Sequence, residues 1–285
     1  MGGVATQPDG RFTGAAGVEI FWRAWLPIGE PRAVIVLAHG AGEHLGRYEH
    51  VAARLVSDEY AVYALDHRGH GRSDGPRALI DRVANAVTDI DQLVLRAGAE
   101  HPGCGVFLLG HSMGGCLAVS YAINHQGRLQ GLLLSGPLAA LDAAPAPVRL
   151  VARGLSAVTP RLGVFAVDAS LVSRDPDVVR AYEDDPLVHH GKLPVRTVAE
   201  LAAAVESFPD TVGAITLPTL VMYGTADQLA PPAGSVMLSE RISSTDKTTI
   251  PYQGLYHEIF NEPEQQRVMD DMCAWLGTHT SAGTA

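Results

Sequence analysis

The chain has 285 residues, of which 47% are hydrophobic and 18% are charged, and its formal net charge is −10. This length and composition indicate a globular protein with a sizeable core, for which one large domain is an ordinary outcome. The negative charge argues against a nucleic-acid partner, since such a protein needs clustered positive charge. The sequence contains no apolar run of the roughly 20 residues that a membrane-spanning helix requires.

The amino-terminal stretch, residues 1–17, is polar and rich in small side chains. It has neither the basic start nor the apolar centre of a signal peptide. The three cysteines, Cys104, Cys116 and Cys273, show no paired metal-ligand spacing, so we expect free thiols in a reducing compartment. These features predict a cytoplasmic protein that can still rest on a membrane surface.

Short apolar runs alternate with helical patterns along most of the chain. Residues 18–26 alternate in character and predict a strand that pairs near Phe12. The continuous apolar runs 33–38 and 60–65 are typical of strands buried on both faces. Further strands are expected at 106–109, 129–134, 217–223 and 247–250. Helices are expected at 48–55, 81–99, after residue 112, at 233–241 and at 263–276.

This alternation predicts an α/β fold with a mostly parallel central sheet and helices on both faces. Residues 137–210 interrupt it with repeated prolines and helical patterns, notably 148–158 and 197–208. We interpret this segment as a helical insertion in the core. The predicted division is a core of 1–136 and 211–277, a helical insertion of 137–210 and a flexible tail of 278–285.

The most informative stretch is F-L-L-G-H-S-M-G-G, residues 107–115. It places Gly-x-Ser-x-Gly between a buried strand and a helix of small residues, which is the context of a nucleophile elbow. A serine at such a sharp turn is strained, and only glycine fits two residues away on either side. Ser112, flanked by Gly110 and Gly114, is therefore the candidate nucleophile.

A serine hydroxyl needs a base, usually a histidine supported by a carboxylate. In strand-elbow hydrolases the chain order is serine, acid, histidine. His257 follows a late strand, unlike the other histidines after Ser112, and is the predicted base. Those other candidates are His125, His189, His190 and His279. Asp227 follows the strand 217–223 and is the predicted acid, with Asp142 and Asp210 as rivals.

Acyl transfer also needs N–H donors for the developing oxyanion. One is expected from Met113, directly after the nucleophile. The other is expected from Ala41, in the turn His39-Gly-Ala-Gly that follows the strand 33–38. Both are main-chain groups, so the side-chain types do not test them.

Two histidine-rich stretches allow other interpretations. The first, with His67, Arg68, His70 and Arg72, would suit an anion, but a turn bonded internally agrees better with the net charge. The second, with His39, Glu43, His44 and Asp66, has no metal-ligand spacing. No G-x-G-x-x-G or phosphate loop follows the first strand. We therefore expect neither a metal nor a cofactor.

The chain resembles the monoacylglycerol lipases, bacterial members above all, over roughly residues 10–277. The matching stretches are 39–44 with 47–48, 66–73, 110–115, 173–175 with 185–188, 224–227 and 256–258. The resemblance implies hydrolysis of monoacylglycerols to glycerol and a fatty acid. It also implies that the insertion, residues 137–210, is a cap over the site. It also assigns Ser112, His257 and Asp227 as the triad, and Ala41 and Met113 as the oxyanion hole.

The resemblance further associates Glu43, Arg47, His111 and Tyr182 with the glycerol end of the pocket, although salt bridges and loop anchors explain the first three equally well. It implies that the cap touches membranes. If it does not touch a membrane, an apolar helix such as 148–158 must line a lipid pocket or contact a second subunit. The sequence is therefore compatible with a monomer and with a cap-mediated homodimer. The alternative functions are a broader carboxylesterase or lysophospholipase with the same triad, and a protein that binds a small lipid without turnover.

Overall fold

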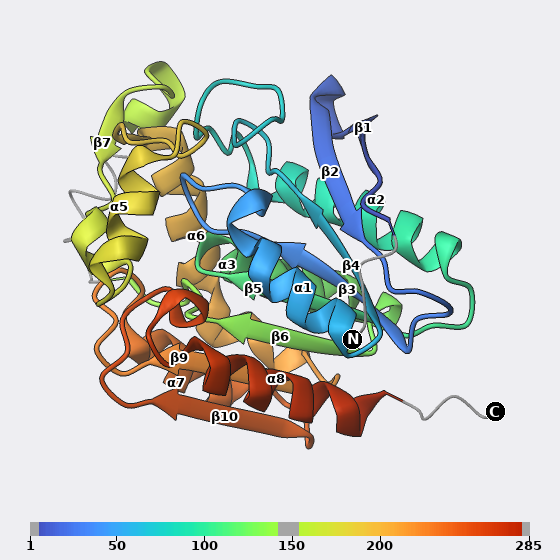
Figure 1. Ribbon diagram of the computed structural model, residues 1–285. Coiled ribbons are helices and arrows are strands. Elements are labelled where there is room, and N and C mark those ends of the chain that lie inside the picture. Colours follow the sequence, from blue (N-terminus) through green and yellow to red (C-terminus); the bar gives the residue numbers. More distant parts are fainter. Residues whose placement is uncertain (1–5, 142–153, 281–285) are drawn as a thin grey trace.

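An eight-stranded sheet forms the centre of the structure (Figure 1), a computed structural model that describes residues 6–141 and 154–280. The strand order is β1-β2-β4-β3-β5-β6-β9-β10. The pairs β1–β2 and β2–β4 are antiparallel, and every later pair in the sheet is parallel. The strands are β1 Asp9–Thr13, β2 Glu19–Trp25, β3 Ala33–Ala38, β4 Tyr60–Leu65, β5 Val106–His111, β6 Gly131–Ser135, β9 Thr219–Gly224 and β10 Lys247–Tyr252.

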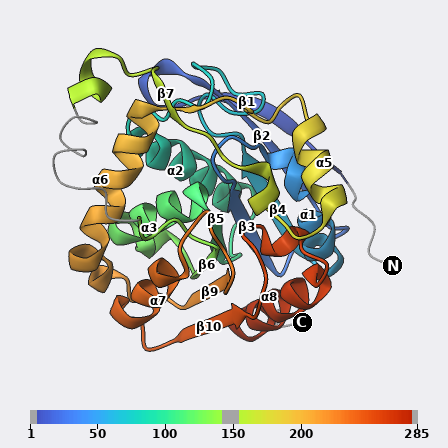
Figure 2. The same cartoon turned by 90° about the vertical axis from the view of Figure 1, so that its left-hand side faces the viewer.

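Helices cover both faces of this sheet, as Figure 2 shows. On one face lie α1 Glu49–Ser57 and α8 Gln265–His279. The other face carries α2 Val83–Glu100, α3 Met113–His125, α6 Val195–Thr211 and α7 Pro232–Arg241. The predicted fold class, an α/β fold with a mostly parallel sheet between helices, is therefore confirmed.

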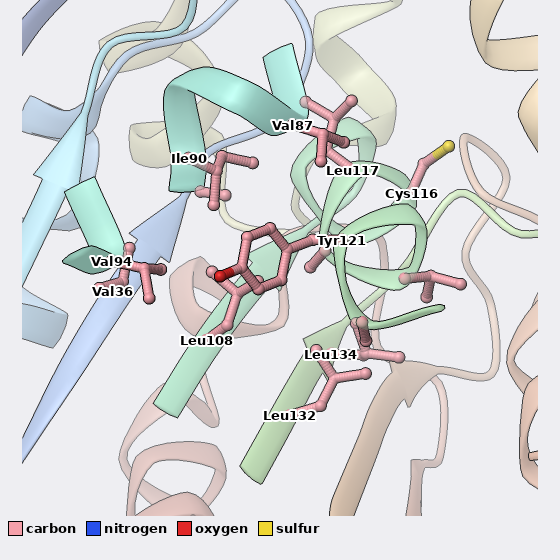
Figure 3. Packing of buried hydrophobic residues seen from close by; sticks show 14 of the residues in the cluster. Val36, Val87, Ile90, Val94, Leu108, Cys116, Leu117, Tyr121, Leu132 and Leu134 are labelled. Carbon is pink, nitrogen blue, oxygen red and sulfur yellow. The ribbon is translucent and has the colours of Figure 1, made fainter. Parts of the chain in front are cut away.

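The core has two halves because successive side chains of a strand point to opposite faces. In β3, Val34 and Val36 belong to the half beneath α2 and α3, while Ile35 and Leu37 belong to the half beneath α1 and α8. Figure 3 shows part of the first half, where Leu108 of β5 lies near Tyr121 of α3. Such two-sided burial explains why the central strands read as continuous apolar runs.

The predicted elements agree with the structure to within a few residues. The expected partner of strand 18–26 is confirmed, because β1 pairs with β2 and places Phe12 opposite Ile20. The sequence pattern did not predict the two-stranded pair formed by β7 Gly163–Phe165 and β8 Leu193–Pro194. Its strands are three and two residues long, too short for a periodic signal.

The segment between β6 and β9 contributes no strand to the main sheet in its described part. It contains the β7–β8 pair, the helix α5 Pro176–Asp184, and α6. Most of the predicted helix 148–158 lies outside the described residues, and its described end, 154–158, is helical. The last α-helix of this segment is α6, and it buries Leu201, Val205 and Phe208 against the core. This segment is thus anchored to the core through α6.

The three cysteines are free, and Cys116 and Cys273 are buried. Within residues 6–141 and 154–280, no helix has both the length and the apolar character needed to cross a membrane.

Candidate active site

Ser112 stands between β5, which ends at His111, and α3, which begins at Met113. Its backbone angles are φ 53° and ψ −117°, a conformation that non-glycine residues rarely adopt. A Cβ atom at Gly110 would overlap the carbonyl oxygen of Gly114, and one at Gly114 would overlap that of Ala38. The turn is therefore as tight as the motif predicts, and glycine is required on both sides of Ser112.

His257 and Asp227 form a buried hydrogen-bonded pair. The Nδ1 of His257 lies 2.7 Å from Oδ2 of Asp227, and the aspartate side chain is fully buried. The other carboxylate oxygen accepts the N–H groups of Leu229 and Ala230 at 2.8 and 2.9 Å. These donors hold the carboxylate in one orientation, so that it fixes the imidazole ring.

The structure brings Ser112 and His257 to one cavity of about 300 Å³. Ala41 and Met113, the expected oxyanion-hole residues, also line this cavity, and Met113 is the first residue of α3. The first N–H groups of a helix have no acceptor within that helix, so the N–H of Met113 is suited to the role. A hydroxyl, an imidazole and a buried carboxylate gathered in this way can carry out acyl transfer.

The rival residues lie elsewhere in the described chain. His125 ends α3, His279 ends α8, and Asp210 lies within the last turn of α6. His189 and His190 lie in the loop after α5 and do not line the cavity. Asp142 lies outside the described residues.

Apolar side chains make up most of the cavity wall, and many come from the segment between β6 and β9. They are Leu138, Leu141, Phe165, Val167, Val172, Leu193, Val198 and Leu201, joined by Leu229 and Pro231 from the loop after β9. Polar side chains contribute the rest of the wall: Glu43, His111, Tyr182, Gln228 and Glu258, beside Ser112 and His257. Such a wall suits a ligand with a long apolar part and a small polar part.

Comparison with known proteins gives the family. A family model described as "Serine aminopeptidase, S33" matches residues 29–264. A monoacylglycerol lipase of Mycolicibacterium smegmatis is 44% identical over 276 residues, covering 96% of this chain and 99% of the relative. The chain belongs to the monoacylglycerol lipase family of serine α/β-hydrolases. The human monoglyceride lipase is 38% identical over 95% of this chain and 91% of its own length.

One solved structure supports the same family. A monoacylglycerol lipase of Paleococcus ferrophilus superposes with a TM-score of 0.81 at 32% identity, over 96% of this chain and 99% of its own. Because one fold serves many functions, the roles of individual residues in this family member rest on its own geometry.

The four residues associated with the glycerol end are not equivalent in the structure. Glu43, His111 and Tyr182 line the cavity. Arg47 lies behind them, with its guanidinium 4.7 Å from the centre of the Tyr182 ring, between the carboxylates of Glu43 and Glu258. The His111 ring lies 4.7 Å from that of His257, centre to centre.

Glu258 is a site residue that sequence reasoning did not select. It lines the cavity and receives two hydrogen bonds from Arg47, at 2.5 and 2.8 Å. Its position directly after His257 was the available signal. Sequence spacing could not have paired it with Arg47, since 211 positions separate the two.

The first histidine-rich turn is buried and partly bonded within the protein: Nδ1 of His70 donates to the carbonyl of Arg68, whereas neither ring nitrogen of His67 has a hydrogen-bond partner in the described chain. His67, Arg68 and His70 are buried, and Arg68 pairs with Asp89 at 2.8 Å. Burial lowers the pKa of His67 to about 3 and that of His70 to about 4, with smaller contributions from neighbouring positive groups. In the described ranges, no group of three or more histidine, cysteine or acidic side chains is placed to hold a metal ion.

The pKa of His257 predicts how activity depends on pH. Burial disfavours the charged imidazole, but the charge of Asp227 and its hydrogen bond outweigh burial and raise the pKa above 6.5. A general base must be neutral, so kcat/KM should increase with pH through a midpoint above 6.5 and fall in acid. A kcat/KM profile for p-nitrophenyl butyrate from about pH 5 to 9 measures this. A midpoint at or below 6.5 would contradict it.

Proposed function

We propose that this chain hydrolyses monoacylglycerols to glycerol and a free fatty acid through an acyl-enzyme on Ser112. The hydroxyl proton passes to Nε2 of His257 as the Ser112 oxygen bonds to the ester carbonyl carbon. The negative charge that develops on the carbonyl oxygen faces the N–H groups of Ala41 and Met113. Asp227 orients the imidazole and stabilises the imidazolium.

The second half of the reaction follows from the same groups. Collapse of the tetrahedral intermediate breaks the bond to the glycerol oxygen, which takes the proton back from His257. A water molecule then attacks the acyl-enzyme, gives a proton to His257 and releases the fatty acid as Ser112 is restored. No cofactor enters either step.

The composition of the cavity wall is the observation that supports monoacylglycerols as the substrate class. Its many apolar side chains suit an acyl chain, and among its polar side chains the His111 ring lies 4.7 Å from that of His257 and Glu258 follows His257 directly. In the described chain, no lysine or arginine lines this cavity. The nearby Arg47 is already paired with two carboxylates. A neutral diol therefore fits the polar wall better than an anionic phosphate head group, which needs unpaired positive charge.

The test compares hydrolysis of 1-oleoylglycerol with that of 1,2-dioleoylglycerol, triolein, lysophosphatidylcholine and p-nitrophenyl butyrate. We expect the highest kcat/KM on the monoacylglycerol. Comparable rates on the diester and triester would identify a general lipase instead. Preference for lysophosphatidylcholine would establish the lysophospholipase alternative, and preference for the short ester would establish a broader carboxylesterase.

We further propose that the cap contacts lipid surfaces. Several of its apolar side chains are exposed: Leu155, Val158, Leu162, Val164 and Phe165. Phe165 also lines the cavity, so these exposed apolar side chains border the site. A lipid surface here would deliver an insoluble substrate directly to Ser112.

Replacing Val158 and Leu162 together by serine should lower affinity for phosphatidylcholine vesicles by about tenfold or more, because each buried aliphatic side chain contributes about 1.5–3 kcal/mol. Co-sedimentation measures the loss. The control is Ile28→Ser, since Ile28 is 75% exposed in the turn at the opposite end of the sheet. If the double variant instead splits a dimer in size-exclusion chromatography and leaves vesicle binding unchanged, the surface is a subunit interface.

A further inference from the structure

Glu43 is bonded to the turn that carries the expected oxyanion donor. Its Oε1 accepts the N–H of Gly40 at 2.5 Å and the hydroxyl of Tyr48 at 2.7 Å. Its Oε2 accepts a hydrogen bond from Arg47 at 2.9 Å. The side chain is 4% exposed, so these three donors use most of what the carboxylate can accept.

The turn 40–42, to which Glu43 is bonded, lies in close contact with Ser112. A Cβ atom at Gly40 would lie 3.2 Å from Cβ of Ser112, a tighter contact than side chains normally make. On its other side the carbonyl oxygen of Gly42 accepts the N–H of His189 at 2.7 Å. The peptide between these two anchors contains the N–H of Ala41. The carbonyl oxygen of Gly40, in the same peptide as that N–H, accepts a hydrogen bond from Nδ1 of His39 at 2.7 Å. Two side chains, those of Glu43 and His39, therefore bond to this part of the turn.

Arg47 extends this connection to the loop of the expected base. Besides Glu43, its guanidinium donates to both carboxylate oxygens of Glu258. Burial opposes ionisation of Glu258, but Arg47 outweighs burial and holds the pKa of that carboxyl at about 2. The second oxygen of Glu258 also accepts from Asn261 at 2.8 Å. The Glu258 carboxylate is therefore engaged by protein donors, like that of Glu43.

We propose that Glu43, Arg47 and Glu258 form a buried ion-pair bridge between the turn 40–42 and the loop of His257. This bridge fixes the position of the turn relative to His257. Glu43 is then a positioning residue of the oxyanion hole, and neither it nor Arg47 serves mainly to bind glycerol. A bidentate guanidinium between two carboxylates has a defined geometry, which suits the alignment of two loops far apart in sequence. The proposal rests only on the Ser112 ester hydrolysis of the proposed function, whatever the alcohol.

A positioning role for Glu43 predicts a different effect of its replacement than a direct contact with glycerol does. Glu43→Met removes the acceptor of the Gly40 N–H and should lower kcat by about 100-fold, since a misplacement near 1 Å has that effect. The loss should be equal on 1-oleoylglycerol and on p-nitrophenyl butyrate, which has no glycerol, with KM changed by less than about threefold. Glu43→Gln keeps an acceptor oxygen and should remain within about tenfold of the native kcat.

Affinity for a transition-state analogue tests the oxyanion hole itself. Butylboronic acid forms a tetrahedral adduct with the serine oxygen and places an oxygen where the oxyanion develops. Its dissociation constant should rise with Glu43→Met by the same factor as kcat falls, because both report transition-state stabilisation. Arg47→Lys provides a second variant if Glu43→Met does not fold. It should cause a smaller loss, again equal on the two esters, because lysine cannot make the two parallel hydrogen bonds that Arg47 makes to Glu258.

Asp89→Asn is the matched control, because Asp89 is also a buried carboxylate that accepts from a backbone N–H and an arginine. It lies away from the cavity, and its replacement should lower the melting temperature while leaving kcat unchanged. A loss confined to 1-oleoylglycerol and expressed in KM would overturn the proposal and assign these residues to the glycerol. Native kcat for Glu43→Met on both esters would also overturn it. Failure to hydrolyse monoacylglycerol would refute only the proposed function.

Discussion

Ser112→Ala should abolish glycerol release from 1-oleoylglycerol, with kcat lowered by about a million-fold, as removal of a triad serine does in other hydrolases. The hydroxyl is the only group at the elbow that can form the acyl-enzyme, and the methyl group of alanine fits the same turn. The fold should be unaffected, since in the described structure the Ser112 side chain makes no capping hydrogen bond to α3. Single-turnover kinetics with radiolabelled substrate measure the residual rate.

Ser120→Ala is the matched control, because Ser120 lies on the same helix and its hydroxyl donates to the carbonyl of Cys116 within that helix. It should keep native activity and covalent labelling by a fluorophosphonate. The Ser112 variant should lose the labelling altogether. Residual activity within about tenfold of native, at unchanged melting temperature, would exclude Ser112 as nucleophile.

Gly114→Ala should destabilise the protein by more than about 3 kcal/mol, at the upper end of what overpacking costs. The added Cβ would overlap the carbonyl oxygen of Ala38 and lie 2.6 Å from that of His39. Both are backbone atoms where β3 meets the turn before Gly40, so neither can rotate away. Either α3 separates from β3 or the turn moves, and the second outcome also lowers kcat. Urea denaturation measures the free energy of unfolding.

Gly98→Ala is the same chemical change at a site without crowding. Its Cβ would lie 3.7 Å from Cγ2 of Val106, an ordinary contact, inside the helix α2. Replacing a helical glycine by alanine should stabilise the protein by about 0.5–1 kcal/mol. Native stability and native kcat for Gly114→Ala would show that the elbow relaxes more readily than its backbone contacts indicate.

Much of the site was predictable because its signals are local. The elbow needs a buried strand, a serine between glycines and a helix, and all three are contiguous in residues 106–122. The expected base and acid were chosen because each follows a strand of a parallel sheet, and the carboxyl ends of such strands share one edge. In the structure, Asp227 and His257 lie 2.7 Å apart across 30 positions, as that rule predicts.

Other features had no local signal. The antiparallel β7–β8 pair joins segments about 30 residues apart through strands too short to show a period. The strand order, in which β3 lies between β4 and β5, depends on crossovers that hydrophobic pattern does not specify. Glu43 and Arg47 were associated with glycerol through resemblance, and only the bonds of their side chains suggest a role in positioning.

The sequence by itself determined the fold class and the elbow, because hydrophobic period and glycine spacing are visible among residues close together in the chain. It also determined the candidate triad, because the chain order and the shared edge of parallel strands are general rules. Only the tertiary structure decided which side chains share the cavity and which charges neutralise each other. Arg47 meets Glu258 across 211 positions. Such a pair forms because both loops end at the same edge of the sheet, where two buried carboxylates require a cation between them.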